Sequence, residues 1–253
     1  CLAEQAKILF AEAEENHLDN EAKIERSRRW YSCSLCEQEY HGVVRCALSW
    51  ACWKTYLGRL EADWPRRFAI NQLGNGLSQA KRHNEALTVR TTELAMMRRL
   101  GASEHNLLLP QANLANTYAR LGRFEQAAQM DRDVYSGWLR LKGEEHEHTI
   151  HAASNYAKSL KDLSRFEEAK ALLRKTIPLA RRVLGENHAD TIRPRSTYAE
   201  ALYRDGDATL DDLSEAVTTL EDTERIARRV LGGGHPFVTG IERSLRKAQA
   251  ALR

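Results

Sequence analysis

Four side chains near the N-terminus have the types and the spacing of a zinc site. The stretch CSLCEQEYHGVVRC follows the pattern C-x2-C-x4-H-x4-C, and its candidate ligands are Cys33, Cys36, His41 and Cys46. Structural zinc takes four thiolate or imidazole ligands in tetrahedral geometry, and C-x2-C lets a single turn present two thiolates. The spacing therefore predicts Zn2+ as a cofactor of this segment, with Cys52 as a competing fourth ligand.

Two other interpretations of these cysteines stay open. Cys46 and Cys52 also suit small apolar core positions in a Trp-rich layer, which would leave Cys33 and Cys36 free in a loop. A C-x2-C pair can instead be redox-active, but that chemistry is typical of a βαβ context, which this sequence lacks. All five cysteines lie in the first 52 residues, and such clustering favours one local thiol or metal site in a reducing compartment.

Composition and charge limit the kind of protein that contains this Cys-rich segment. The 253 residues are 42% hydrophobic and 29% charged, which is typical of a folded globular chain. A net charge of +3 is too balanced to indicate nucleic acid as a partner. No apolar run approaches the roughly 20 residues of a membrane span, and no signal peptide is visible at the N-terminus. These features predict a cytoplasmic protein that binds neither nucleic acid nor membrane.

Two landmarks recur between residues 65 and 236 and indicate four internal repeats. A Glu-Ala or Gln-Ala pair begins at Glu85, Gln126, Glu168 and Glu215. A closing glycine recurs at steps of 42, 42 and 47 residues, at Gly101, Gly143, Gly185 and Gly232. Because two independent landmarks agree on the period, the repeat dominates the architecture.

Apolar residues at helical spacing divide each repeat into two helices. We expect small residues (Ala115, Ala157 and Ala199) where helices approach closely, and a left-handed conformation at the closing glycines. Pro178 should kink or break the second helix of the third repeat. Thr209 and Asp212 resemble a capping box that starts the last second helix.

One histidine recurs after each closing glycine, at His105, His146, His188 and His235. A position repeated in the turn between repeats is better explained by turn structure than by metal binding, although His148 and His151 lie close to His146.

The repeats resemble tetratricopeptide repeats of the kinesin light chain type. The segments that carry the resemblance are NLANTYARLGRFEQA (residues 113–127), RRVLGENHADT (181–191) and RRVLGGGHP (228–236). The resemblance implies an all-α, right-handed superhelical solenoid of antiparallel helix pairs whose concave face binds protein partners. The Cys/Trp-rich segment before the repeats is similar to that of uncharacterised algal repeat proteins, which adds no function.

We therefore predict four regions: a helical lead (1–32), a Cys/Trp-rich module or half-repeat (33–64), four repeats (65–236) and a capping helix (237–253). The predicted groove would hold a peptide or helix of a partner protein. Amide side chains suit peptide backbones because they both donate and accept hydrogen bonds. Matching positions of successive first helices predict an exposed ladder of contacts: Gln72, Asn75, Asn113, Asn116, Asn155 and Lys158.

No catalytic constellation or nucleotide-binding motif is present in the sequence. The sequence thus predicts a non-catalytic protein-interaction scaffold. The alternative is a zinc-dependent adaptor, resembling a ubiquitin ligase, in which the Cys/His module recruits or acts as an effector. Metal content would separate the two functions.

Overall fold

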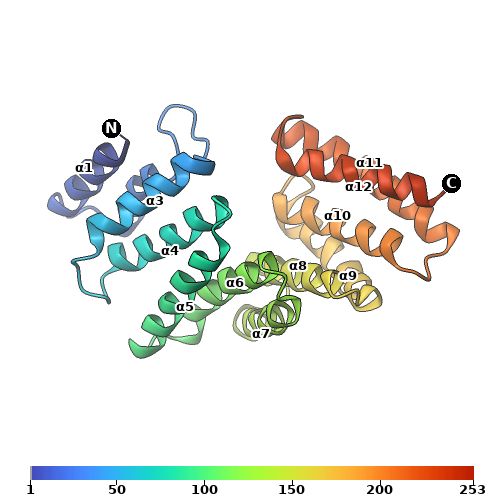
Figure 1. The fold of residues 1–253 in the computed structure, drawn as a ribbon, viewed down its shortest axis with the longest axis horizontal. Helices are drawn as coiled ribbons and strands as arrows, with labels where there is room; N and C mark the ends of the chain where they lie inside the picture. Colours follow the sequence, from blue (N-terminus) through green and yellow to red (C-terminus); the bar gives the residue numbers. More distant parts are fainter. Residues whose placement is uncertain (1) are drawn as a thin grey trace. The chain divides into compact units, whose positions relative to one another are not determined.

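The computed structural model describes residues 2–253 and is built from α-helices, with no named strand in that range (Figure 1). The helices before the repeats are α1 (Leu2–Glu15), α2 (Asn20–Ser27), the short 3-10 helix η1 (Arg28–Trp30) and α3 (Gly42–Tyr56). The next four are α4 (Trp64–Gln79), α5 (His83–Arg99), α6 (Glu104–Arg120) and α7 (Phe124–Lys142). The last five are α8 (Glu147–Asp162), α9 (Phe166–Leu184), α10 (Ala189–Arg204), α11 (Leu210–Leu231) and α12 (Pro236–Ala251). The all-α prediction is confirmed, and no helix of the described range is long and apolar enough for a membrane span.

The chain divides into two compact units, the first ending at Leu121 and the second beginning at Gly122. The boundary falls inside the second repeat, so its first helix α6 belongs to unit 1 and its second helix α7 belongs to unit 2. In unit 2, each helix from α7 to α12 packs against the next one along the chain. In unit 1 the same holds for α3 to α6.

The turns between repeats of unit 2 combine a glycine with a histidine. Gly143, Gly185 and Gly232 have φ of 80°, 86° and 82°, which an L side chain rarely adopts, and each ends a second helix. The three histidines His146, His188 and His235 then cap the following first helices, because each Nδ1 accepts the backbone N–H two residues on, at 3.1–3.2 Å. The predicted turn role is confirmed for these three, whereas His105 lies within α6, behind its N-cap Ser103.

The sequence predicts a capping box at the start of α11 and an interruption of α9 at Pro178. The capping box is confirmed, since Thr209 N–H donates to Asp212 Oδ2 at 2.9 Å and Asp212 N–H donates to Thr209 Oγ1 at 3.1 Å. Of the kink or break expected at Pro178, the break does not occur, because α9 continues from Phe166 to Leu184. Proline lacks the N–H that would donate to the Arg174 carbonyl, but both Pro178 and Arg174 are exposed, on the solvent side of α9, where the loss of one helical hydrogen bond is tolerated best.

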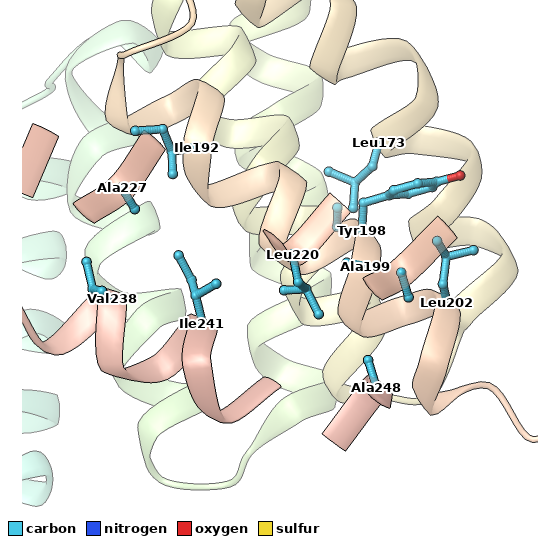
Figure 2. Packing of buried hydrophobic residues seen from close by; sticks show 12 residues of the cluster. Leu173, Ile192, Tyr198, Ala199, Leu202, Leu220, Ala227, Val238, Ile241 and Ala248 are labelled. Atoms are coloured by element: carbon cyan, nitrogen blue, oxygen red, sulfur yellow. The ribbon is translucent and has the colours of Figure 1, made fainter. Parts of the chain in front are cut away.

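The core of unit 2 is a continuous apolar layer between its helix pairs (Figure 2). Its large members include Leu173, Ile192, Leu202, Leu220 and Ile241, each no more than 1% exposed. Ala157 and Ala199 are fully buried in the same cluster, as expected for close helix contacts.

The core of unit 1 is aromatic at its N-terminal end. Phe10 of α1 stacks on Trp64 of α4 with ring centroids 5.8 Å apart, and meets Tyr56 of α3 edge-on at 5.6 Å. Trp30 also meets Tyr56 edge-on, with ring centroids 6.0 Å apart. The segment before the repeats is thereby joined to α4 by a shared core.

Candidate functional site

The candidate zinc ligands divide between a loop and a core. Cys33 and Cys36 lie together in the turn before α3, where Cys33 Sγ accepts the Leu35 N–H at 3.5 Å. Hydrogen bonds from the backbone N–H groups of Cys36 and Leu35 lower the pKa of the Cys33 thiol. The turn therefore favours a thiolate at Cys33, as both metal binding and oxidation require.

Cys46 and Cys52 lie in apolar surroundings. Cys46 packs with Leu73 and Leu77, and Cys52 is fully buried in the aromatic cluster, where burial raises the pKa of its thiol. His41 is the exposed N-cap residue of α3. Between residues 2 and 253, no three His, Cys, Asp or Glu side chains gather as a metal-binding group. The two buried thiols lie where core cysteines are expected, and the four-ligand zinc set stays a prediction.

Elemental analysis of the whole protein, purified without chelator, tests that prediction. If zinc is held by Cys33, Cys36, His41 and Cys46, we expect about one zinc per chain. Cys33→Ser should abolish the metal, whereas Cys52→Ser should retain it. If the purified wild-type protein contains no zinc, Cys46 is a core residue and not a metal ligand. The hypothesis of a zinc-dependent adaptor would then be rejected.

Gln72 and Asn75 of α4 are committed to contacts within unit 1. Gln72 is 7% exposed, and its Oε1 accepts from Arg45 Nη2 of α3 at 2.5 Å. Asn75 accepts from Arg90 Nη2 of α5 at 2.5 Å and donates to Asn71 at 3.2 Å. Gln72 is therefore not an exposed member of the predicted ladder, because the buried Arg45 needs its oxygen. Both side chains instead hold α4 to its neighbours.

Asn113 and Asn155 remain available for a ligand. They lie half-buried on α6 of unit 1 and α8 of unit 2, and in the described part of the chain their side-chain amides make no hydrogen bond. Asn116 is exposed and donates to the Ala112 carbonyl at 3.1 Å. Lys158 is exposed and pairs with Asp162, one turn along α8, at 3.2 Å. A ligand would have to exchange these last two contacts, each of which lies within a single helix.

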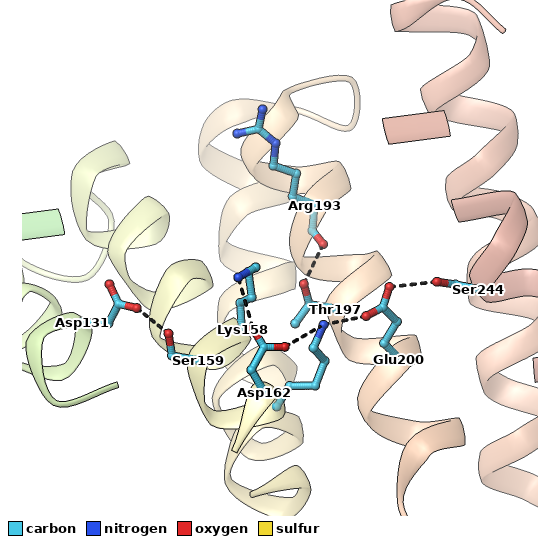
Figure 3. Close-up of polar contacts among 9 residues, drawn as sticks. Asp131, Lys158, Ser159, Asp162, Arg193, Thr197, Glu200 and Ser244 are labelled. Carbon is cyan, nitrogen blue, oxygen red and sulfur yellow. Dashed lines mark hydrogen bonds and ion pairs between the residues drawn. The ribbon is translucent and has the colours of Figure 1, made fainter. Parts of the chain in front are cut away.

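A polar network joins α8 and α10, the first helices of the last two repeats, to the capping helix α12 (Figure 3). Lys161 of α8 is 7% exposed, and its Nζ lies 2.5 Å from Glu200 Oε2 of α10. The other oxygen of Glu200 accepts from Ser244 Oγ of α12 at 2.8 Å. One carboxylate thus bridges the three helices α8, α10 and α12. The repeat pattern did not reveal Lys161, because a buried lysine has the same local sequence signal as an exposed one.

A second polar contact fixes α7 to α8. Asp131 is 5% exposed, and its Oδ2 accepts from Ser159 Oγ at 2.6 Å (Figure 3). Burial raises the pKa of Asp131 to about 6, although the Ser159 hydrogen bond and the nearby charges of Lys158 and His151 act in the opposite direction. Specific polar pairs between side chains therefore hold α7 to α8, and α8 to α10.

Comparisons with known proteins agree with this architecture. A family model described as tetratricopeptide repeat matches residues 66–140, 111–181 and 148–210. No curated protein matches the chain. BtubC (BKLC) from P. vanneervenii is similar in structure, with a TM-score of 0.60 and 18% identity over 82% of this chain and 87% of that one. A putative kinesin light chain with nearly identical TPR-like repeats from Podosopora anserina has a TM-score of 0.56 and 16% identity, over 91% of this chain and 96% of that one. At these identities the likeness shows the fold alone.

Proposed function

Because the chain belongs to the tetratricopeptide repeat family, we propose that it is a non-catalytic scaffold that binds a peptide or helix of a partner protein. The binding surface would be formed by the first helices of its repeats. Family membership supports an interaction role, and the net charge of +3 favours protein over nucleic acid as the partner. The clustering of all five cysteines in the first 52 residues favours a reducing compartment, so we propose the cytoplasm as the location.

The contact of α8, α10 and α12 is the observation that carries the proposal. Both α8 and α12 pack against α10, so the first helices of the last two repeats and the capping helix form one surface. The Lys161–Glu200–Ser244 bridge holds them in register, which lowers the conformational cost of binding a partner. The same helices carry exposed polar side chains, such as Lys158 on α8 and Arg243 on α12.

Loss of a free amide in each unit tests whether the first helices bind the partner. Peptides selected from a display library on the whole chain should bind Asn113→Ala, on α6 of unit 1, or Asn155→Ala, on α8 of unit 2, roughly two- to tenfold more weakly than wild type, according to the unit that holds them. One lost neutral hydrogen bond costs about 0.5–1.5 kcal/mol, which gives that factor. Fluorescence anisotropy with the selected peptides measures the affinity.

The matched control is Asn84→Ala/Asn187→Ala, which also removes one amide from each unit but outside the first helices. It should bind the selected peptides as wild type does. Ala157→Leu should instead destabilise unit 2, because Ala157 is fully buried between helices. Equal affinity of both first-helix variants and wild type would move the binding surface away from these helices.

A further inference from the structure

Two cysteines lie at the tip of a small hairpin that precedes α3. Across this hairpin Ser32 forms an antiparallel bridge with Glu39. The Glu37 N–H donates to the Cys33 carbonyl at 3.0 Å and closes the turn that contains Cys36. Cys33 and Cys36 therefore share one backbone turn, which is fixed by its own hydrogen bonds and lies outside the helices.

This turn brings the two sulfur atoms together. The Cys36 thiol donates a hydrogen bond to Cys33 Sγ. Cα atoms three residues apart in a turn are less than about 7 Å apart, and a disulfide spans Cα distances of about 4.4–6.8 Å. Cys33 and Cys36 can therefore form a disulfide without a large movement of the chain.

The surroundings of Cys33 favour it as the attacking sulfur. The backbone N–H groups of Leu35 and Cys36 donate to Cys33 Sγ, the first at 3.5 Å, and the Tyr40 hydroxyl is a further hydrogen-bond partner. Such donors stabilise negative charge on sulfur, and it is the thiolate that attacks a disulfide bond. Cys33 is half-buried and Cys36 is exposed, so both are within reach of a small oxidant.

The other described cysteines differ from this pair. Cys46 and Cys52 are buried in apolar clusters, where thiols are inert. Among the cysteines between residues 2 and 253, only Cys33 and Cys36 are therefore both adjacent and accessible. Any oxidation of the folded protein by a small disulfide should be confined, within that range, to the hairpin.

We propose that Cys33 and Cys36 are a reversible redox site, at which a low-molecular-weight disulfide such as glutathione disulfide converts the two thiols to an intramolecular disulfide. The Cys33 thiolate attacks one sulfur of glutathione disulfide, which forms a mixed disulfide and releases one glutathione thiolate. Cys36 loses its proton to solvent, attacks the Cys33 sulfur and releases the second glutathione thiolate. The chain loses two electrons and two protons, and glutathione disulfide gains them as two thiols.

This redox site is independent of the proposed peptide-binding function. Oxidation of the chain itself needs only the turn, whereas thiol chemistry on other proteins is typical of a βαβ context. A disulfide leaves no thiolate for a metal, so oxidation and zinc binding exclude one another at Cys33 and Cys36.

The test exposes whole wild-type protein to glutathione disulfide, alkylates the remaining thiols with iodoacetamide in denaturant, and maps tryptic peptides by mass spectrometry. Cleavage after Arg29 and Arg45 releases residues 30–45, which contain Cys33 and Cys36 and no other cysteine. After oxidation this peptide should take up no alkyl group and be two hydrogen atoms lighter than the reduced peptide. Dithiothreitol should restore alkylation at both sites.

The next tryptic peptide, residues 46–54, is the internal control because it contains both buried cysteines, Cys46 and Cys52. Both should be alkylated in denaturant whether or not the folded protein has met the oxidant. Loss of their alkylation in parallel with that of residues 30–45 would show general thiol oxidation and overturn a specific site.

Two single variants separate the roles of the thiols. Cys36→Ser should acquire glutathione at Cys33 at about the wild-type rate and stop at the mixed disulfide, because no second thiol resolves it. Cys33→Ser should acquire glutathione at Cys36 about tenfold more slowly, because the N–H donors of the turn are directed at Cys33. Circular dichroism verifies that both variants are folded.

Three results would overturn the inference. The wild-type peptide 30–45 could remain fully alkylated after oxidation, or it could stop at a mixed disulfide with glutathione, or it could be cross-linked to a second chain. Faster reaction of Cys33→Ser than of Cys36→Ser would overturn the assignment of Cys33 as the attacking sulfur.

Discussion

Gly76→Ala is expected to lower the free energy of unfolding of unit 1 by about 2 kcal/mol. A Cβ atom on Gly76 of α4 would lie 2.6 Å from Ser49 Cβ and 3.1 Å from Cys46 Cα, both on α3. Because one contact is with backbone, the two helices must separate, and overpacking of this kind costs about 3 kcal/mol. The better helix propensity of alanine returns about 1 kcal/mol.

Urea denaturation followed by tryptophan fluorescence measures this effect, since four of the five tryptophans belong to unit 1. Gly58→Ala is the matched control, because a Cβ atom there meets nothing within 4 Å. The control should stay within about 0.5 kcal/mol of wild type. Equal denaturation midpoints for Gly76→Ala and wild type would contradict the close approach of α3 and α4.

Asp131→Asn is expected to stabilise unit 2 by about 1–3 kcal/mol at pH 8. The carboxyl group of Asp131 has a pKa raised by burial to about 6 from an unfolded value of 3.8, so the folded state binds its proton more tightly. That contribution to stability is fully present below about pH 4 and is lost as the pH rises through about 6. Asparagine carries no charge at any pH, and its oxygen can still accept the hydrogen bond from Ser159.

Hydrogen exchange of α7 and α8 peptides, measured at pH 4.5 and 8, reports the stability of this region. The stabilisation by Asp131→Asn should shrink toward zero at the lower pH. Asp133→Asn, whose side chain is exposed on the same helix, serves as the control and should change little at either pH. An Asp131 variant that is less stable than wild type at pH 8 would show that the charged carboxylate is favourable where it lies.

The repeat period, the turns between repeats and the helix caps follow from the sequence alone, because each depends on residues close together in the chain. The closing glycines satisfy a backbone conformation that other residues avoid, and His146, His188 and His235 cap helices through bonds that span two residues. The Thr209–Asp212 box spans three. Such features are determined within one turn, so the pattern of residue types predicts them without knowledge of the fold.

The candidate site depends on contacts that the sequence does not contain. Gln72 and Asn113 occupy matching positions in successive first helices, yet Gln72 is used by Arg45 from 27 residues earlier, while the Asn113 amide stays free in the described chain. Lys161 and Glu200 are 39 residues apart, and Glu200 and Ser244 are 44 apart. Which polar side chain is buried and paired, and which stays exposed for a partner, is decided by the packing of helices distant in sequence. Local spacing therefore determines the repeats of this protein, and only the tertiary structure decides which of their polar side chains are available to bind.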